Sequence, residues 1–85
     1  MKILHLVRQM GDGRAASTAE RQRQLGHEVY LLLLHDAVLD CPAFDGTVFA
    51  CEADVRARCA PHEHVAVTYD EIARLIFEHD RVVSW

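Results

Sequence analysis

The sequence lacks the features that mark several large classes of protein. No stretch approaches the roughly 18–20 apolar residues that a membrane-spanning helix requires, so we expect no membrane association. The nine Lys and Arg residues are outnumbered by thirteen Asp and Glu residues, and the formal net charge is −4. Because nucleic-acid-binding surfaces are usually basic, we also expect no direct contact with nucleic acid. Internal repeats and low-complexity segments are absent as well.

Cysteine is scarce, and its spacing excludes a redox or zinc pair of the CxxC type. The three cysteines, Cys41, Cys51 and Cys59, are an odd number. A disulfide framework is therefore not expected, and free thiols suit a reducing compartment. The apolar run that follows Lys2 is too short for the core of a signal peptide. These features predict a cytoplasmic protein.

Signals for a metal or an organic cofactor are weak. The segment His62-Glu63-His64 brings two imidazoles together, but zinc requires three or four ligands. The loop Gly11-Asp12-Gly13 follows the first apolar run and resembles an anion-binding turn, but it lacks the full glycine fingerprint of dinucleotide sites. We therefore expect neither a metal nor a cofactor, and we disfavour a nucleotide- or flavin-binding function.

Short apolar runs alternate with polar or amphipathic stretches along the whole chain. The runs predict strands near residues 2–7, 28–34, 47–51, 64–67 and 81–85. The intervening stretches predict helices over 15–25, 52–58 and 69–79, and a short turn after the second strand. Since the central run is apolar without alternation, both faces of its strand should be buried.

This alternation predicts a single domain over residues 1–85 with a small, flavodoxin-like, three-layer α/β fold and a five-stranded, mainly parallel sheet. The flavodoxin strand order, 2-1-3-4-5, is the expected one. A chain of this size buries a modest share of its surface, so we expect an oligomer. Trp85 is interpreted either as a packed terminus or as an interface anchor.

Two local signals fix helix ends. Gly26 is placed to end the first helix in a left-handed conformation. Thr68 and Glu71 form a capping-box pattern at the start of the last helix, whose apolar face should include Ile72, Leu75 and Ile76.

Cys51 is the candidate reactive residue. It ends an apolar run and directly precedes a helix, which places it at the carboxyl edge where open α/β sheets bind and react. Unpaired N–H groups and the helix dipole favour an anionic sulfur there, and the thiolate is the reactive form of cysteine. We expect its thiol to be accessible. The alternative is a small apolar residue packed at a strand end, and the neighbouring Glu52 and Asp54 oppose a thiolate.

Four further residues are expected near this thiol. His35 and Asp36 end the second predicted strand and face the same edge of the sheet. Arg56 and Arg58 lie on the helix after Cys51 and would offset the carboxylates if they fold back toward the sulfur.

Several of these segments together resemble a known family. Residues 29–39 look like a family strand followed by an acidic residue, a small residue and an apolar pair. Residues 48–50 and 56–58 resemble its next strand and helix end, and 67–71 with the closing Val82-Val83-Ser84-Trp85 resemble its C-terminal signature. On these segments the chain resembles the DsrE/DsrF/DsrH-like sulfur-relay family, closest to the DsrH/TusB branch.

The resemblance implies a small flavodoxin-like subunit of hexamer-type assemblies that pass persulfide sulfur between carrier proteins, in tRNA 2-thiouridine synthesis or in sulfur oxidation. It implies as partners sister DsrE/DsrF (TusD/TusC)-like subunits or a second copy, together with sulfur donor and acceptor carriers. Cys51 falls on the acceptor position of the DsrE/TusD subunit, whereas Cys59 replaces a family glycine. The DsrH branch often has a cysteine in the first helix, where Ala19-Glu20 lie here.

Two functions follow from the resemblance. The first is a sulfur-relay subunit, with sulfurtransferase activity left open, that uses Cys51 as persulfide acceptor. The alternative is a non-catalytic structural subunit of a DsrEFH/TusBCD-like oligomer.

Overall fold

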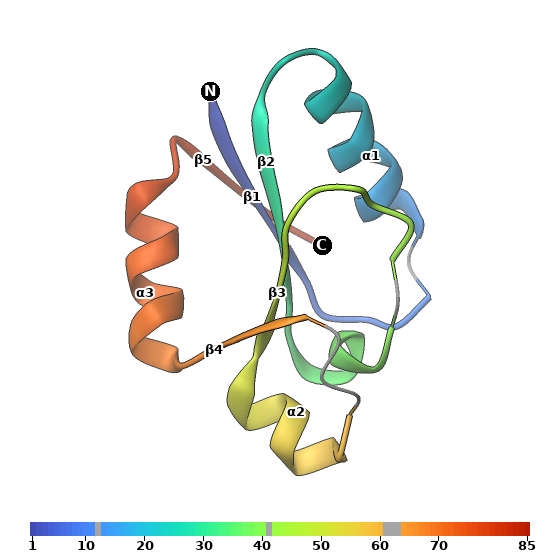
Figure 1. The fold of residues 1–85 in the computed structure, drawn as a ribbon, viewed down its shortest axis with the longest axis vertical. Coiled ribbons are helices and arrows are strands. Elements are labelled where there is room, and N and C mark those ends of the chain that lie inside the picture. The colour runs from blue at the N-terminus through green and yellow to red at the C-terminus, as the bar shows by residue number, and fades with distance from the viewer. Residues whose placement is uncertain (12, 41, 61–63) are drawn as a thin grey trace.

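The computed structural model describes residues 1–11, 13–40, 42–60 and 64–85. Strands and helices alternate along the chain as β1 (Lys2–Val7), α1 (Gly13–Gln24), β2 (Glu28–Leu33), the 3-10 helix η1 (His35–Leu39), β3 (Val48–Cys51), α2 (Glu52–Arg58), β4 (Val65–Val67), α3 (Tyr69–Glu78) and β5 (Arg81–Ser84). The five strands form one sheet, all of whose neighbouring pairs are parallel. With α1 and α3 on opposite sides of the sheet (Figure 1), the predicted three-layer α/β fold is confirmed.

The order of the strands differs from the expected one. The sheet runs β4-β3-β2-β1-β5, so the flavodoxin order 2-1-3-4-5 is wrong. The chain adds β2, β3 and β4 successively on one side of β1, and only then returns to place β5 on the other side of β1. Right-handed crossovers that advance in one direction lie on one face of a sheet, and a crossover in the reverse direction lies on the opposite face. This rule explains why α3 lies on the opposite face from α1.

Two apolar layers flank the sheet. On one face, small side chains of α1, Ala15, Ala16 and Ala19, are buried against β1 and β2 and allow the helix a close approach. On the other face, Ile72 and Leu75 of α3 pack on a smaller cluster around the strands. No residue of α3 is fully buried, and Ile76, expected on its apolar face, is 40% exposed. The face under α3 is therefore the less completely covered one.

The two predicted helix-end signals are confirmed. Gly26 has φ +97°, and the His27 N–H donates to the Gln22 carbonyl across it, as in a left-handed helix end. At the start of α3 the Thr68 side chain accepts from the Glu71 N–H, and the Glu71 carboxylate accepts from the Thr68 N–H.

A hydrogen-bonded chain ties β5 to the centre of the molecule. The indole Nε1–H of Trp85 donates to Nδ1 of the fully buried His5 at 2.9 Å, and His5 Nε2 lies 2.7 Å from Gln22 Oε1 of α1. Because Nδ1 must accept, Nε2 carries the proton and donates to Gln22. Burial lowers the pKa of His5, against a smaller raising effect of the Gln22 hydrogen bond. In this chain, Trp85 is a packed residue.

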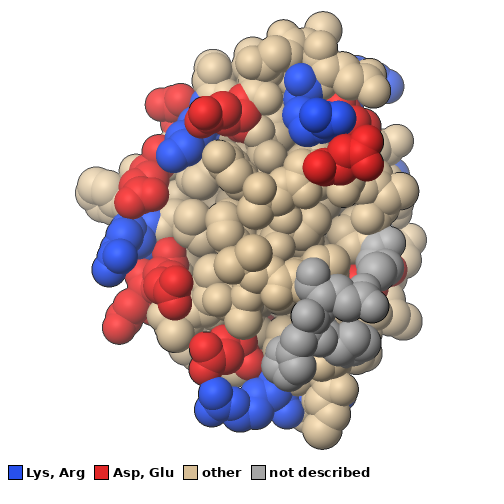
Figure 2. Space-filling view, in the orientation of Figure 1, with Lys and Arg blue, Asp and Glu red and all other residues tan. Residues whose placement is uncertain are grey.

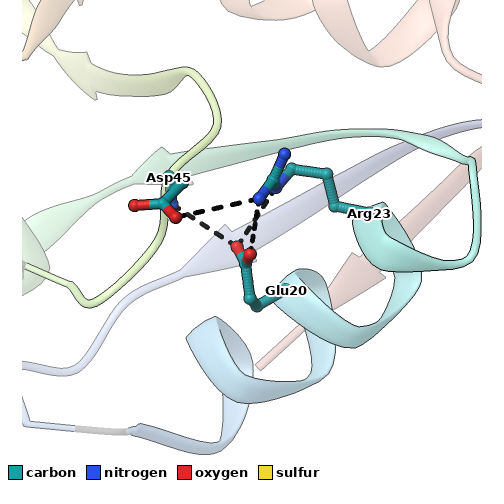
Figure 3. Close-up of polar contacts among 3 residues, drawn as sticks. All are labelled: Glu20, Arg23 and Asp45. Atoms are coloured by element: carbon teal, nitrogen blue, oxygen red, sulfur yellow. Dashed lines mark hydrogen bonds and ion pairs between the residues drawn. The ribbon is translucent and has the colours of Figure 1, made fainter.

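Charged side chains link α1 to the loop before β3 (Figure 3). Arg23 Nη2 lies 2.6 Å from Glu20 Oε1 and 3.8 Å from Asp45 Oδ2, and the Asp45 N–H donates to Glu20 at 3.4 Å. All three groups are at the surface, so they orient the loop more than they stabilise the fold.

Candidate functional site

Cys51 lies where the sequence predicts it. It is the last residue of β3 and the N-cap residue of α2, and its backbone is extended, with φ −64° and ψ 118°. Its thiol, however, is 0% exposed. The expected position is therefore confirmed, whereas the expected accessibility is wrong for this conformation of the chain.

The carboxylate of Asp54 binds several polar groups near this thiol. Asp54, in the first turn of α2, accepts hydrogen bonds from the His35 N–H at 2.9 Å and from Arg58 Nη1 at 3.2 Å. Burial raises the pKa of Asp54, but the hydrogen bond from the His35 N–H, the interaction with the Cys51 thiol and the charges of His35 and Arg58 outweigh burial and hold that pKa below its ordinary value. Asp54 is therefore an anion next to the Cys51 thiol.

Tyr69 is a second polar neighbour of the Cys51 thiol. It is the first residue of α3, immediately after the N-cap that follows β4, so it reaches the same edge of the sheet. Electrostatic interaction and hydrogen bonding with Cys51, followed by the charge of Asp54, raise the pKa of Tyr69. Tyr69 is 67% exposed, so most of its side chain lies in solvent.

The expected neighbours of Cys51 divide into two groups. His35 and Arg58 contact Asp54, and Arg58 Nε also donates to Asp36 at 2.9 Å, which joins η1 to α2. Arg56 instead pairs with Glu52 at 2.7 Å and is exposed along the helix. The structure therefore brings His35, Asp36 and Arg58 to the site through Asp54 and leaves Arg56 outside it.

The sequence analysis does not predict that Tyr69 lies near Cys51 or that Asp54 accepts hydrogen bonds from His35 and Arg58. The signal for Tyr69 in the sequence is its position, since it follows the fourth predicted strand and must lie at the same carboxyl edge as Cys51. The sequence shows Asp54 only as a charge that repels a thiolate, because its hydrogen bond from the His35 main chain depends on the tertiary fold.

Among the described residues, the other candidates form no second cluster of this kind. Cys59 is an exposed, free thiol at the end of α2 with φ +48°. Cys41, Asp12, His62 and Glu63 lie outside the described residues, so the zinc alternative at His62-Glu63-His64 and the loop at 11–13 stay untested. Within the described ranges, no three His, Cys, Asp or Glu side chains gather as metal ligands would.

The fold and the site together define a small α/β domain with a thiol at the carboxyl edge of a parallel sheet. Its fold is similar to that of the YchN protein from E. coli, with a TM-score of 0.81 and 17% sequence identity over 100% of this chain and 99% of that chain. At this identity the similarity concerns the fold alone. No protein-family model and no curated protein matches the sequence. Among the helices of the described residues, none has the length and apolar character needed to cross a membrane.

Proposed function

We propose that this chain is a sulfur-relay subunit that accepts a sulfur atom on Cys51 and passes it to a carrier protein. The observation that carries the proposal is the position of Cys51 at the junction of β3 and α2, where the anionic Asp54 and Tyr69 are its polar neighbours. The similarity to YchN, which points to a sulfur-relay family fold, supports it. So do the segments that resemble the DsrE/DsrF/DsrH-like family.

The transfer is a thiol–persulfide exchange. The Cys51 thiol releases its proton to solvent, and the thiolate attacks the outer sulfur of a donor persulfide, R–S–SH. The S–S bond of the donor breaks, a new S–S bond forms on Cys51, and the donor leaves as the thiolate R–S⁻. Products are a Cys51 persulfide and a donor thiolate that takes up one proton, so atoms, charge and electrons balance without a cofactor.

Access to the sulfur requires a movement of Tyr69. Because this side chain is largely in solvent, its ring can turn away without opening the apolar core. A docked carrier would supply the thiol or persulfide at the place that the hydroxyl leaves. Tyr69 is thus assigned as a cover of the site rather than as a reacting group.

Association with other subunits belongs to the same proposal. Phe77, on the outer side of α3, is 92% exposed, and Ile76 beside it is 40% exposed. In Figure 2 the charged side chains lie mostly toward the rim of the visible face, and its centre carries few of them. We propose sister subunits or a second copy as partners, donor and acceptor carriers as transient partners, and the cytoplasm as location.

A second candidate function rests on the burial of the thiol. A fully buried Cys51 beside the carboxylates Glu52 and Asp54 is the arrangement expected of a packed, unreactive cysteine. In this case the chain is a structural subunit that completes an oligomer whose reactive cysteine lies on another chain.

Sulfur loading separates the two functions. The chain is incubated with a cysteine desulfurase and cysteine, or with a persulfidated carrier, and its peptides are mapped by mass spectrometry. The relay function predicts an added mass of about 32 Da on Cys51. The variant Cys51→Ala should lose the label and keep the fold, and the matched variant Cys59→Ala should retain it. Absence of label on every cysteine with a competent donor would leave the structural subunit as the function.

A further inference from the structure

A second site is suggested by a cleft at the carboxyl edge of the sheet, next to the thiol site but separate from it. Its lining consists of Arg8, Gln9, Arg14, His35 and Trp85, and its volume is about 510 Å³. It lies beside β1, where the direction of strand addition reverses: β2 lies on one side of β1, and β5 lies on the other. In open α/β sheets, ligands bind outside the carboxyl ends of the strands at such a reversal.

The side chains of this cleft have the chemistry of an anion site. Two guanidinium groups and an imidazole line it, and its described lining contains no Asp or Glu side chain, although the chain carries a net charge of −4. Guanidinium groups bind oxyanions through paired, charge-assisted hydrogen bonds. The described lining therefore offers hydrogen-bond donors suited to an oxyanion.

Trp85 positions both arginines. Its main-chain oxygen accepts a hydrogen bond from Arg8 Nε at 3.2 Å, and its indole ring lies 6.0 Å from the guanidinium carbon of Arg14. The ring itself is held by the hydrogen bond to His5. The arginines are thus attached to a rigid part of the fold, which lowers the entropy cost of binding a ligand between them.

The backbone of His35 has an unusual conformation. Its φ of +52° is unusual for a residue other than glycine, and the hydrogen bond from its N–H to Asp54 Oδ2 holds it there. Backbone held in such a region clusters at ligand sites. The same residue lines the cleft.

We propose that this cleft binds a phosphate-type oxyanion, either free or as the anionic group of a larger metabolite. Binding at this position does not require the Cys51 thiol. The inference therefore stands apart from the proposed sulfur-relay function, and each fails by its own experiment.

The chain contains one tryptophan, and it lines the cleft, so its fluorescence is a direct reporter. The full chain is titrated with inorganic phosphate and, separately, with adenosine monophosphate at constant ionic strength. A saturable change of fluorescence is expected. Arg8→Gln and Arg14→Gln should each weaken binding about 10-fold or more, because each removes charge-assisted hydrogen bonds to the ligand.

The matched control is Arg81→Gln, which removes the same charge at the opposite end of β5. It should change the affinity by less than about 2-fold, since distant surface charges are screened by salt. Equal binding of the two probes identifies a free oxyanion as the ligand type, and tighter binding of adenosine monophosphate identifies a larger metabolite. No saturable response to either probe, or an equal loss in Arg81→Gln, overturns the proposal.

Discussion

Replacing Trp85 by phenylalanine should destabilise the fold chiefly through His5. The substitution keeps an aromatic ring but removes the indole N–H, so Nδ1 of the fully buried His5 loses its donor. An unsatisfied buried acceptor costs about 1–3 kcal/mol. For a domain of this size, a loss of about 2 kcal/mol lowers the melting temperature by about 8–16 °C. Urea denaturation followed by circular dichroism measures the change in the free energy of unfolding.

A double-mutant cycle isolates this hydrogen bond from the loss of ring area. A His5→Leu background contains no buried Nδ1 that could lose its hydrogen bond. In this background Trp85→Phe should therefore lower the free energy of unfolding by at least about 1 kcal/mol less than in the native background. Equal costs in the two backgrounds would refute the assignment, because the destabilisation would then come from packing alone. So would a Trp85→Phe variant that unfolds at the same urea concentration as the native chain.

Three further perturbations test other parts of the molecule. The pKa of His5 is lowered in the folded state, so the unfolded chain binds more protons, and stability should fall as the pH drops through the ordinary histidine value of 6.5 toward the folded pKa. Urea melts of His5→Gln should lack this pH dependence. Cys59→Gly should raise the free energy of unfolding by about 0.5–1 kcal/mol, since φ is +48° there and glycine carries no left-handed penalty; a loss in urea stability would contradict this. Tyr69→Ala should raise the alkylation rate of Cys51 about 10-fold or more relative to the exposed Cys59 in the same chain, measured by mass spectrometry, and an unchanged ratio would show that Tyr69 is not the cover.

Local signals in the sequence are sufficient to predict the elements of this fold. Gly26 and the pair Thr68 and Glu71 mark helix ends through hydrogen bonds between residues close in the chain, so no tertiary contact is needed to recognise them. The strand order depends instead on which runs pair. Leu31 and its neighbours are apolar on both faces whether β3 adds beside β2 or beside β1, so the hydrophobic pattern is the same for either topology.

In the candidate site, too, some features follow from local sequence and others depend on tertiary contacts. That Cys51 ends a strand at a helix start follows from the sequence, and that its thiol is covered does not, because Tyr69 comes from the next strand-helix junction. The two arginines of α2 show most clearly that the sequence alone does not determine which residues join the site. Glu52 with Arg56 and Asp54 with Arg58 are equivalent i,i+4 pairs in the sequence, and only the packing of η1 against α2 sets Arg58 between Asp36 and Asp54.

His35 connects the two proposed sites through a single residue. Its N–H donates to Asp54, the carboxylate next to Cys51, and the same residue lines the arginine cleft. An oxyanion bound in the cleft adds negative charge near the thiol, and nearby negative charge disfavours a thiolate. Occupancy of the cleft should therefore slow the alkylation of Cys51. An alkylation rate of Cys51 that is the same with and without phosphate would show that the two sites do not communicate.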